Sequence, residues 1–226
     1  MTVLIKIKNV TKSYQLNKEK VHVLRGIDFE VASGDWLTIT GPSGSGKTTL
    51  LKVLSGIEQP DEGSIMIGDF HISEGSEEER RNFRRDNIGY IFQDFQLFEQ
   101  FNLLLNVMIP LLPYEKKEQI EKKAKEILAN VNLSHREKHR PAMVSGGEKQ
   151  RTAIARSLIN RPNILLCDEP TGNLDVDSRN HVMSILKDLQ KEEITIILVT
   201  HDTELSTYGN HLFEMRDGLL TRKQHS

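Results

Sequence analysis

The chain has 226 residues, of which 37% are hydrophobic, and its 30 basic and 32 acidic side chains leave a formal charge of −2. This length argues for one large domain, or one domain with a small subdomain, and against a two-domain multienzyme. The near balance of charge provides no positive field for a phosphate backbone, so we expect no nucleic-acid partner.

Cysteine content and hydropathy indicate a compartment. Cys167 is the one cysteine, so no intramolecular disulfide can form, and the first residues lack the charged-then-apolar pattern of a secretory signal. The most apolar stretch, residues 103–112, is interrupted by Asn106 and Pro110 and is shorter than the ~18 to 20 residues that cross a bilayer. We expect a cytoplasmic protein with no direct membrane insertion, whose membrane role, if any, comes through a partner.

The first third of the chain alternates apolar and polar residues as strands do. A hairpin-type turn is predicted at Gly34 and Asp35, and a glycine-rich loop at residues 41–46 precedes a helix at 48–54. The strands predicted here are residues 4–8, 27–31, 36–40 and 65–67. This β-rich start leads into an α/β core.

From residue 77 to about 140 the composition becomes charged and helical, which indicates a helical insertion; residues 116–130 have apolar side chains at helical spacing. The arginine-rich run at 80–85 stands among acidic residues and is typical of a solvated helix face. Helices at 148–160 and 178–191 then alternate with apolar strands at 164–167 and 194–199. This alternation predicts a mostly parallel sheet with right-handed crossovers. Cys167 fits a buried strand position.

Residues 41–48 match the phosphate-loop pattern G-x-x-x-x-G-K-[ST] between a predicted strand and a predicted helix. Its backbone N–H groups and the helix N-terminus favour phosphate, Lys47 adds a positive charge, and Thr48 is the expected Mg²⁺ ligand. The predicted nucleotide-binding residues of this loop are Gly41, Pro42, Ser43, Gly44, Ser45, Gly46, Lys47, Thr48 and Thr49.

The buried strand at 164–167 leads into two carboxylates, which places them at the carboxyl edge of the sheet, where nucleotide sites lie. We expect Asp168 to hold Mg²⁺ through water and Glu169 to orient or deprotonate the water that attacks the γ-phosphate.

Residues 144–151, Val-Ser-Gly-Gly-Glu-Lys-Gln-Arg, resemble the signature motif of the ABC (ATP-binding cassette) ATPases, with Val144 where the family has Leu. The resemblance spans Tyr14 to the final hairpin around Asp217. It implies a P-loop α/β fold with a mostly parallel core sheet, an N-terminal antiparallel β subdomain and an inserted helical subdomain. It also implies a core of about 1–90 and 140–226 and a helical subdomain of about 91–140. The signature residues implied for the ATP site of a second subunit are Ser145, Gly146, Gly147 and Glu148.

The other family motifs are matched by single residues. Tyr14 resembles the aromatic residue that stacks on adenine, and Gln93 the glutamine that touches Mg²⁺ and links the site to the helical subdomain. His201 resembles the histidine that contacts the γ-phosphate. Asp175 resembles the D-loop residue that crosses to the opposing subunit; the alternative interpretation is that it is only a neighbour of a helix N-cap.

The resemblance implies a homodimeric ATPase with ATP and Mg²⁺ as cofactors, in which each ATP lies between the phosphate loop of one subunit and the signature motif of the other. Residues 92–98 and 168–175 resemble the branch of lipoprotein-release, macrolide-export and antimicrobial-peptide-resistance ATPases, although Leu105 stands where that branch often has Glu. This implies a separate integral membrane permease, with the ATPase held peripherally at the inner face of the membrane.

Two questions stay open at this point. The apolar residues Phe95, Leu97, Phe98, Phe101 and 103–105 form either a docking groove for the permease or plain subdomain core. The competing function is a soluble ABC ATPase that acts on a non-membrane partner. A regulatory module without turnover is disfavoured, because Glu169 and His201 are both present.

Overall fold

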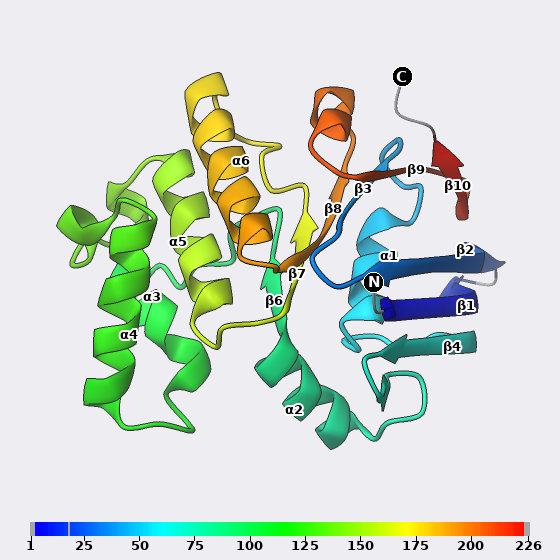
Figure 1. Cartoon of the computed structure of the whole chain (residues 1–226), viewed down its shortest axis with the longest axis horizontal. Coiled ribbons are helices and arrows are strands. Elements are labelled where there is room, and N and C mark those ends of the chain that lie inside the picture. Colours follow the sequence, from blue (N-terminus) through cyan, green and yellow to red (C-terminus); the bar gives the residue numbers. More distant parts are fainter. Residues whose placement is uncertain (1–2, 18, 224–226) are drawn as a thin grey trace.

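Two β-sheets, with helices between and around them, make up the protein (Figure 1). The computed structural model describes residues 3–17 and 19–223. The first sheet is antiparallel, with strand order β2-β1-β4-β5. Its strands are β1 (Val3–Leu16), β2 (Glu19–Ala32), β4 (Glu62–Ile67) and β5 (Phe70–His71).

The second sheet has the order β10-β9-β3-β8-β7-β6, and all its neighbours are parallel except β10. Its strands are β3 (Trp36–Thr40), β6 (Ile88–Ile91), β7 (Ile164–Asp168), β8 (Thr195–Thr200), β9 (His211–Arg216) and β10 (Leu219–Lys223). Thr40 pairs with Thr200, and Asp168 with Val199. The carboxyl ends of β3, β7 and β8 therefore meet at one edge.

The helices cover the faces of these sheets and form a group beside them. The α-helices are α1 (Lys47–Leu54), α2 (Glu77–Asn87), α3 (Leu103–Met108), α4 (Lys117–Asn130), α5 (Gly146–Leu158) and α6 (Val176–Lys191). The short 3₁₀ helices are η1 (Ile109–Leu111), η2 (Ser134–Arg136), η3 (Pro141–Met143) and η4 (Thr203–Thr207).

Helix α1 packs within the core that joins the two sheets. Its buried Leu50 and Leu54 belong to the same apolar cluster as Ile5 of the first sheet and Ile39 of the second. The other face of the second sheet packs on α5 and α6. Because α1 begins at the phosphate loop, this packing fixes the loop against both sheets at once.

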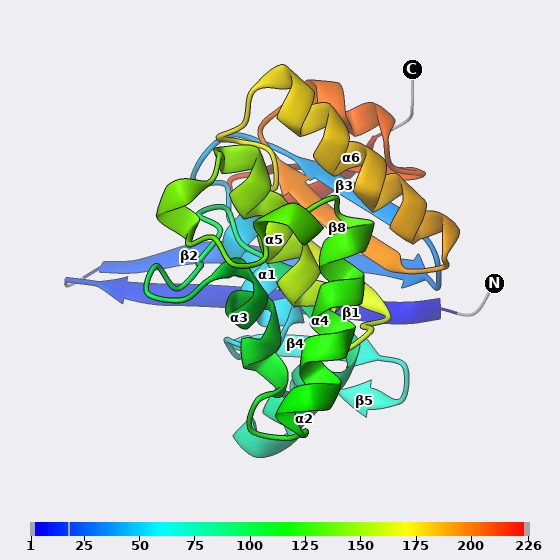
Figure 2. The same cartoon turned by 90° about the vertical axis from the view of Figure 1, so that its left-hand side faces the viewer.

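Helices α3, α4 and α5 share a separate apolar cluster, which includes Val107, Leu128 and Ala155. Figure 2 views this helical group from its own side, with α4 and α3 in front of the sheets. Fully buried Asn106 ties the group to the preceding loop, because its amide bonds the backbone of Phe98 and Phe101. Among the helices in the described part of the chain, none is long and apolar enough to cross a membrane.

The α/β fold with an antiparallel N-terminal sheet and a helical insertion is confirmed. Two local predictions were wrong. Residues 88–91 are not part of a continuous helical insertion from residue 77, because the apolar run Ile88–Ile91 pairs with β7 as the edge strand of the second sheet. Gly34 and Asp35 do form a turn, yet β2 and β3 belong to different sheets, so the turn is not a hairpin.

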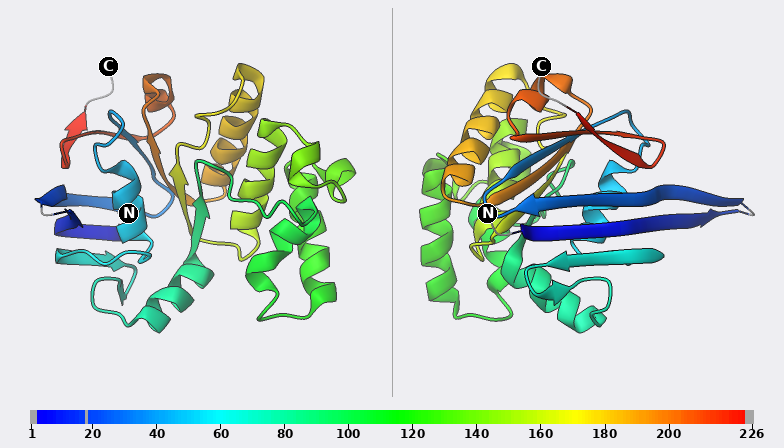
Figure 3. Two further views of the ribbon diagram at one scale, coloured as in Figure 1. Left: turned by 180° about the vertical axis from the view of Figure 1, so that it is seen from behind. Right: turned by 45° about the vertical axis from the view of Figure 1, so that its right-hand side comes forward.

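The paired strands β1 and β2 are longer than predicted, and Figure 3 shows their far end extending beyond the rest of the molecule. The alternation of apolar and polar residues could not reveal that end of the strands, because its side chains are exposed on both faces of the sheet.

Cys167 and the arginines of α2 differ in how far they agree with prediction. Cys167 is fully buried, as predicted, and burial raises the pKa of its thiol. The arginine-rich helix α2 is less solvated than predicted: Arg80 is 8% exposed and bonds the carbonyl of Gly75, and Arg84 donates to the carbonyl of Ser55 at 3.1 Å. Arg80 is buried and Arg84 partly buried because loop carbonyls offer them acceptors.

Candidate active site

The phosphate loop connects β3 to α1 in the position that its sequence predicts. Gly46 has φ +106°, and a Cβ there would lie 2.8 Å from the carbonyl oxygen of Val23, so only glycine fits. The ammonium of Lys47 donates to the carbonyls of Gly41 and Pro42 at 2.8 and 3.0 Å. Burial lowers the pKa of Lys47, an effect that the carboxylates of Glu169 and Asp168 oppose.

Thr48 and Asp168 meet directly, with the Thr48 hydroxyl donating to Asp168 Oδ1 at 3.0 Å. Asp168 is buried at the end of β7, and burial raises the pKa of its carboxyl although the bond from Thr48 favours the charged form. The arrangement brings oxygen atoms of α1 and β7 to one point.

The residues present fit a hard divalent cation. Thr48 and Asp168 offer oxygen atoms, and Gln93 lines the same pocket as Thr48. Within residues 3–17 and 19–223, no three His, Cys, Asp or Glu side chains cluster as a self-sufficient metal site. A cation here would therefore complete its coordination with water and substrate oxygens, as Mg²⁺ does at nucleotide sites.

Glu169 follows β7 with φ +48°, a left-handed conformation that is strained for glutamate. Its Oε2 accepts from the Thr200 hydroxyl at 3.1 Å and lies 3.0 Å from His201 Nδ1. Its Oε1 lies 3.8 Å from the Lys47 ammonium. The carboxylate is thus held between the ends of β7 and β8 and the phosphate loop.

The phosphate loop, Glu169 and His201 line one pocket of about 510 Å³, a volume within the ~300 to 1,000 Å³ of small-molecule sites. Its lining residues are Val23, Ser43, Gly44, Gly46, Lys47, Thr48, Thr49, Gln93, Glu169 and His201. Beside it, the buried hydroxyl of Ser45 has no hydrogen-bond partner in the described structure. A polar atom left unpaired in this way indicates a loop built to receive a ligand.

Tyr14 lies outside this lining, on β1, where its hydroxyl bonds the carboxylate of Glu58. Ser145, Gly146, Gly147 and Glu148 also lie outside it. Ser145 is the N-cap of α5 and forms a capping box with Glu148, whose carboxylate accepts from Arg136 at 2.9 Å.

Asp175 lies next to the signature motif. It is the N-cap of α6 and accepts from the backbone and hydroxyl of Ser178 at 2.8 Å each. A Cβ on Gly147 would lie 2.7 Å from Ser178 Cβ, so the start of α5 needs glycine to fit against α6. One chain therefore holds the signature motif and Asp175 together, apart from the residues that line the pocket.

Two residues of the site were missed by the sequence analysis. Thr200 accepts from the backbone of Asp202 and donates to Glu169, so it fixes the catalytic carboxylate candidate. Tyr90 packs on Phe92 with ring centroids 4.3 Å apart, and burial and then the charge of Asp168 raise its pKa. Thr200 is the last residue of β8 and Tyr90 the last but one of β6, the two strands that neighbour β7, and that position was the available signal.

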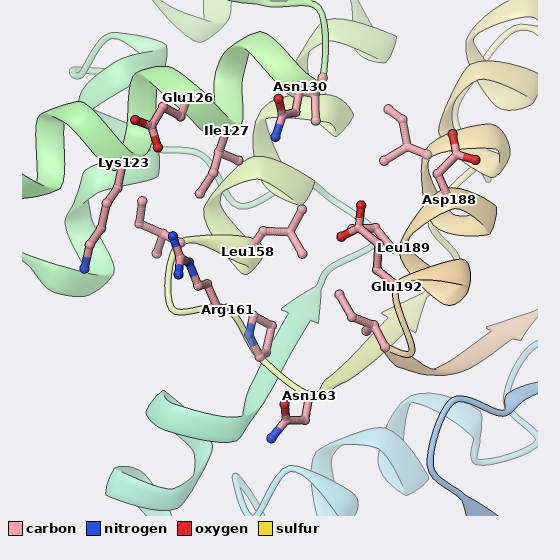
Figure 4. A pocket seen from close by; sticks show the side chains of 15 residues that line it. Lys123, Glu126, Ile127, Asn130, Leu158, Arg161, Asn163, Asp188, Leu189 and Glu192 are labelled. Carbon is pink, nitrogen blue, oxygen red and sulfur yellow. The ribbon is translucent and has the colours of Figure 1, made fainter.

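A larger cavity of about 730 Å³ lies elsewhere, between α4, the end of α5 and α6 (Figure 4). Its apolar floor includes Ile127, Leu158 and Leu189, and acidic and basic side chains stand around it. None of the predicted site residues lines it, so size alone does not identify the active site.

Comparison with known proteins agrees with this geometry. Residues 24–172 match the family model described as ABC transporter. The chain is 41% identical over 224 residues to the lipoprotein-releasing system ATP-binding protein LolD of Saccharophagus degradans, covering 98% of each. It is 42% identical over 217 residues to the macrolide export ATP-binding/permease protein MacB of Bdellovibrio bacteriovorus, covering 96% of this chain and 33% of that protein.

Solved structures give the same result. The ATP-binding cassette MJ0796, from Methanocaldococcus jannaschii, matches with a TM-score of 0.90 in its dimeric structure, at 35% identity and covering 99% of this chain and 100% of that one. A second dimeric structure of that cassette, in a post-hydrolysis state bound to ADP and Pi, also has a TM-score of 0.90, at 34% identity and the same coverage.

The burial of Asp168 makes a prediction about stability. Because burial raises the carboxyl pKa above its ordinary value of 3.8, the folded protein takes up a proton more readily than the unfolded chain, and stability falls as pH rises through that range. We expect Asp168→Asn to raise the melting temperature of the nucleotide-free protein at pH 7, with a gain that shrinks as pH falls toward 3.8. A variant less stable than the parent at every pH would show that the charged carboxylate stabilises the fold.

Proposed function

Because the chain belongs to the ABC transporter family as an ATP-binding and ATP-hydrolysing subunit, we propose that its pocket of about 510 Å³ binds MgATP and that two chains close around two ATP molecules to drive a membrane permease. One observation carries this proposal. The phosphate loop, Gln93, Glu169 and His201 come from four separate segments and line the same pocket.

The phosphate loop binds the triphosphate. Its N–H groups and the start of α1 face the phosphates, and the Lys47 ammonium exchanges the loop carbonyls for phosphate oxygens. Thr48, Gln93 and Asp168 are the residues that would hold Mg²⁺, with Asp168 acting through water. When bound, Mg²⁺ neutralises charge on the phosphate oxygens. Tyr14 stacks on the adenine.

Glu169 acts on the attacking water. It lies within hydrogen-bond reach of His201 and Thr200 and near Lys47, so its carboxylate is already oriented at the end where the γ-phosphate binds. Glu169 orients the water and accepts its proton, while His201 turns to the γ-phosphate. The exposed His201 side chain has room for that movement.

Dimerisation supplies the second half of each site. The N-terminus of α5, with Ser145 at its cap, is a phosphate-binding element that stands outside this chain's own pocket. In a homodimer, Ser145 to Glu148 of one subunit cover the ATP held by the other, and Asp175 crosses between them. Hydrolysis at Glu169 then loosens the dimer, so ATP acts as a switch between two states.

The partner is a separate integral membrane permease, which would hold the chain peripherally at the cytoplasmic face of the membrane. The names of the LolD and MacB relatives, with their release and export functions, support this class. A pocket of about 300 Å³ between α2, β6 and the end of α5 is lined by four arginines, of which Arg85 pairs with the neighbouring Asp86 at 2.7 Å, and this excess of positive charge suits an acidic segment of that partner. Its arginines are Arg81, Arg84, Arg85 and Arg156.

The apolar residues after Gln93 were expected to form either a docking groove for the permease or the core of the helical subdomain, and they divide between these two roles. Leu103 is fully buried and Leu104 and Leu105 pack against the helical cluster, whereas Phe98 is 44% exposed. We assign only the Phe98 end to docking.

The proposed helical subdomain of about 91–140 rests on the apolar cluster of α3, α4 and α5. That cluster also takes Ala155 and Ile159 from the core of about 1–90 and 140–226.

Glu169→Gln tests the catalytic assignment. The amide keeps the shape of the side chain but cannot take a proton, so we expect ATP binding to persist, turnover to fall at least about 100-fold and an ATP-bound dimer to accumulate. Glu192→Gln, a change at an exposed carboxylate after α6, serves as the control. Hydrolysis at the parental rate in Glu169→Gln would remove Glu169 from the catalytic role.

Ser145→Arg tests the shared site. A bulky cation at the start of α5 blocks closure, so the variant should bind ATP as a monomer on a sizing column. The control is Ser76→Arg, because Ser76 is also a capping-box N-cap, on α2, and its loss costs a similar ~1 kcal/mol of capping. ATP-dependent dimers of Ser145→Arg at the parental yield would contradict the shared site.

Charge reversal tests the docking surface. Arg81→Glu with Arg85→Glu places two carboxylates in the arginine pocket, so we expect the tagged chain to lose the integral membrane protein that otherwise co-purifies with it from membranes. Lys187→Glu makes the same kind of change on an exposed position of α6 and should keep that protein. Equal recovery with the double variant, or recovery of soluble proteins alone with the parent, would count against the proposed partner.

A further inference from the structure

Tyr14 is fixed at both ends. Its backbone pairs with Val21 in the β1–β2 ladder, and its hydroxyl donates to the carboxylate of Glu58. Burial and then this hydrogen bond raise the pKa of the Tyr14 phenol to about 12, so the group remains a donor at physiological pH. The half-buried ring therefore has little freedom to turn about its side-chain bonds.

Glu58 belongs to the loop that follows α1, and that loop folds back on the helix. The backbone N–H groups of Ile57 and Glu58 both donate to the carbonyl of Lys52, at 3.0 and 3.2 Å. The Lys52 ammonium lies 3.5 Å from the Glu58 carboxylate. Since α1 begins at Lys47, Glu58 is tied to the same helix whose first residue serves the phosphate site.

Asp61 makes a second connection between the same two segments. It accepts from the backbone of Ser13 at 2.8 Å and from the Lys12 ammonium at 3.4 Å, and its own N–H donates to Thr11 at 2.8 Å. The residues of β1 just before Tyr14 are therefore bound to the loop after α1 by backbone and side-chain bonds.

We propose that Glu58 is a positioning residue for nucleotide binding, which acts by holding the Tyr14 hydroxyl and so sets the tilt of the ring relative to the phosphate loop. This inference rests on the proposed function, in which Tyr14 stacks on adenine. A ring ordered before the ligand arrives loses less side-chain entropy on binding. Glu58 itself touches neither the base nor the phosphates.

Calorimetric binding of ADP and of pyrophosphate to the full chain tests the inference, because only ADP carries a base and neither ligand is hydrolysed. Loss of one hydrogen bond that orders the ring should weaken ADP binding about 3- to 10-fold in Glu58→Ala and in Tyr14→Phe. The double variant should bind ADP no more weakly than either single variant, since both remove the same bond. Pyrophosphate binding should change less than about twofold.

Two further variants separate the possible failures. Glu58→Gln keeps an acceptor and should retain most of the ADP affinity, and Lys52→Met removes the ion pair but leaves the Tyr14 bond, so it should bind as the parent does. Equal weakening of ADP and pyrophosphate in Glu58→Ala, or no weakening of either, would overturn the positioning role while leaving the stacking role of Tyr14 intact. Unchanged ADP affinity in Tyr14→Ala would overturn the stacking role itself, and the inference with it.

Discussion

The register of three parallel strands is the constraint on which the site depends. Strands β3, β7 and β8 end side by side, with Thr40 opposite Thr200 and Asp168 opposite Val199. The loop after β3 therefore lies beside the carboxylates after β7, and the hydrogen bond from Thr48 to Asp168 joins the two. A one-residue shift of β7 would turn Asp168 to the other face of the sheet and break that bond.

The site is assembled at some expense of stability. Burial raises the pKa of Asp168 and lowers the pKa of Lys47, so it disfavours the charged form of each. Glu169 has a left-handed backbone conformation, and the hydroxyl of Ser45 is buried without a hydrogen-bond partner in the described structure. The two buried charges and the unpaired hydroxyl are unfavourable without ligand, and a metal-bound triphosphate would supply them with opposite charge and an acceptor. The backbone strain at Glu169 is a separate cost of orienting its carboxylate. The packing of α1 between the two sheets compensates for them, because many fully buried apolar side chains stabilise the region that carries the phosphate loop.

The sequence was informative where chemistry and backbone geometry require particular residues. Glycines fixed the phosphate loop, and an apolar strand ending in Asp168 and Glu169 located the acidic edge, because parallel strands must end together. It was uninformative about Tyr90, Thr200 and Glu58, which are ordinary residue types whose roles arise only from tertiary register. The sequence also did not predict β6, because a run of four residues between helical segments is too short for its pattern to distinguish a strand from a helix.

A site divided between two chains makes ATPase activity depend on protein concentration, and that dependence can be measured. If the phosphate loop of one chain needs Ser145 of another, the rate per chain should rise with chain concentration and level off once dimers form. At low concentration the total rate should then grow with the square of the chain concentration. A rate per chain that stays constant over a 100-fold dilution, at saturating MgATP, would show instead that one chain holds a complete site.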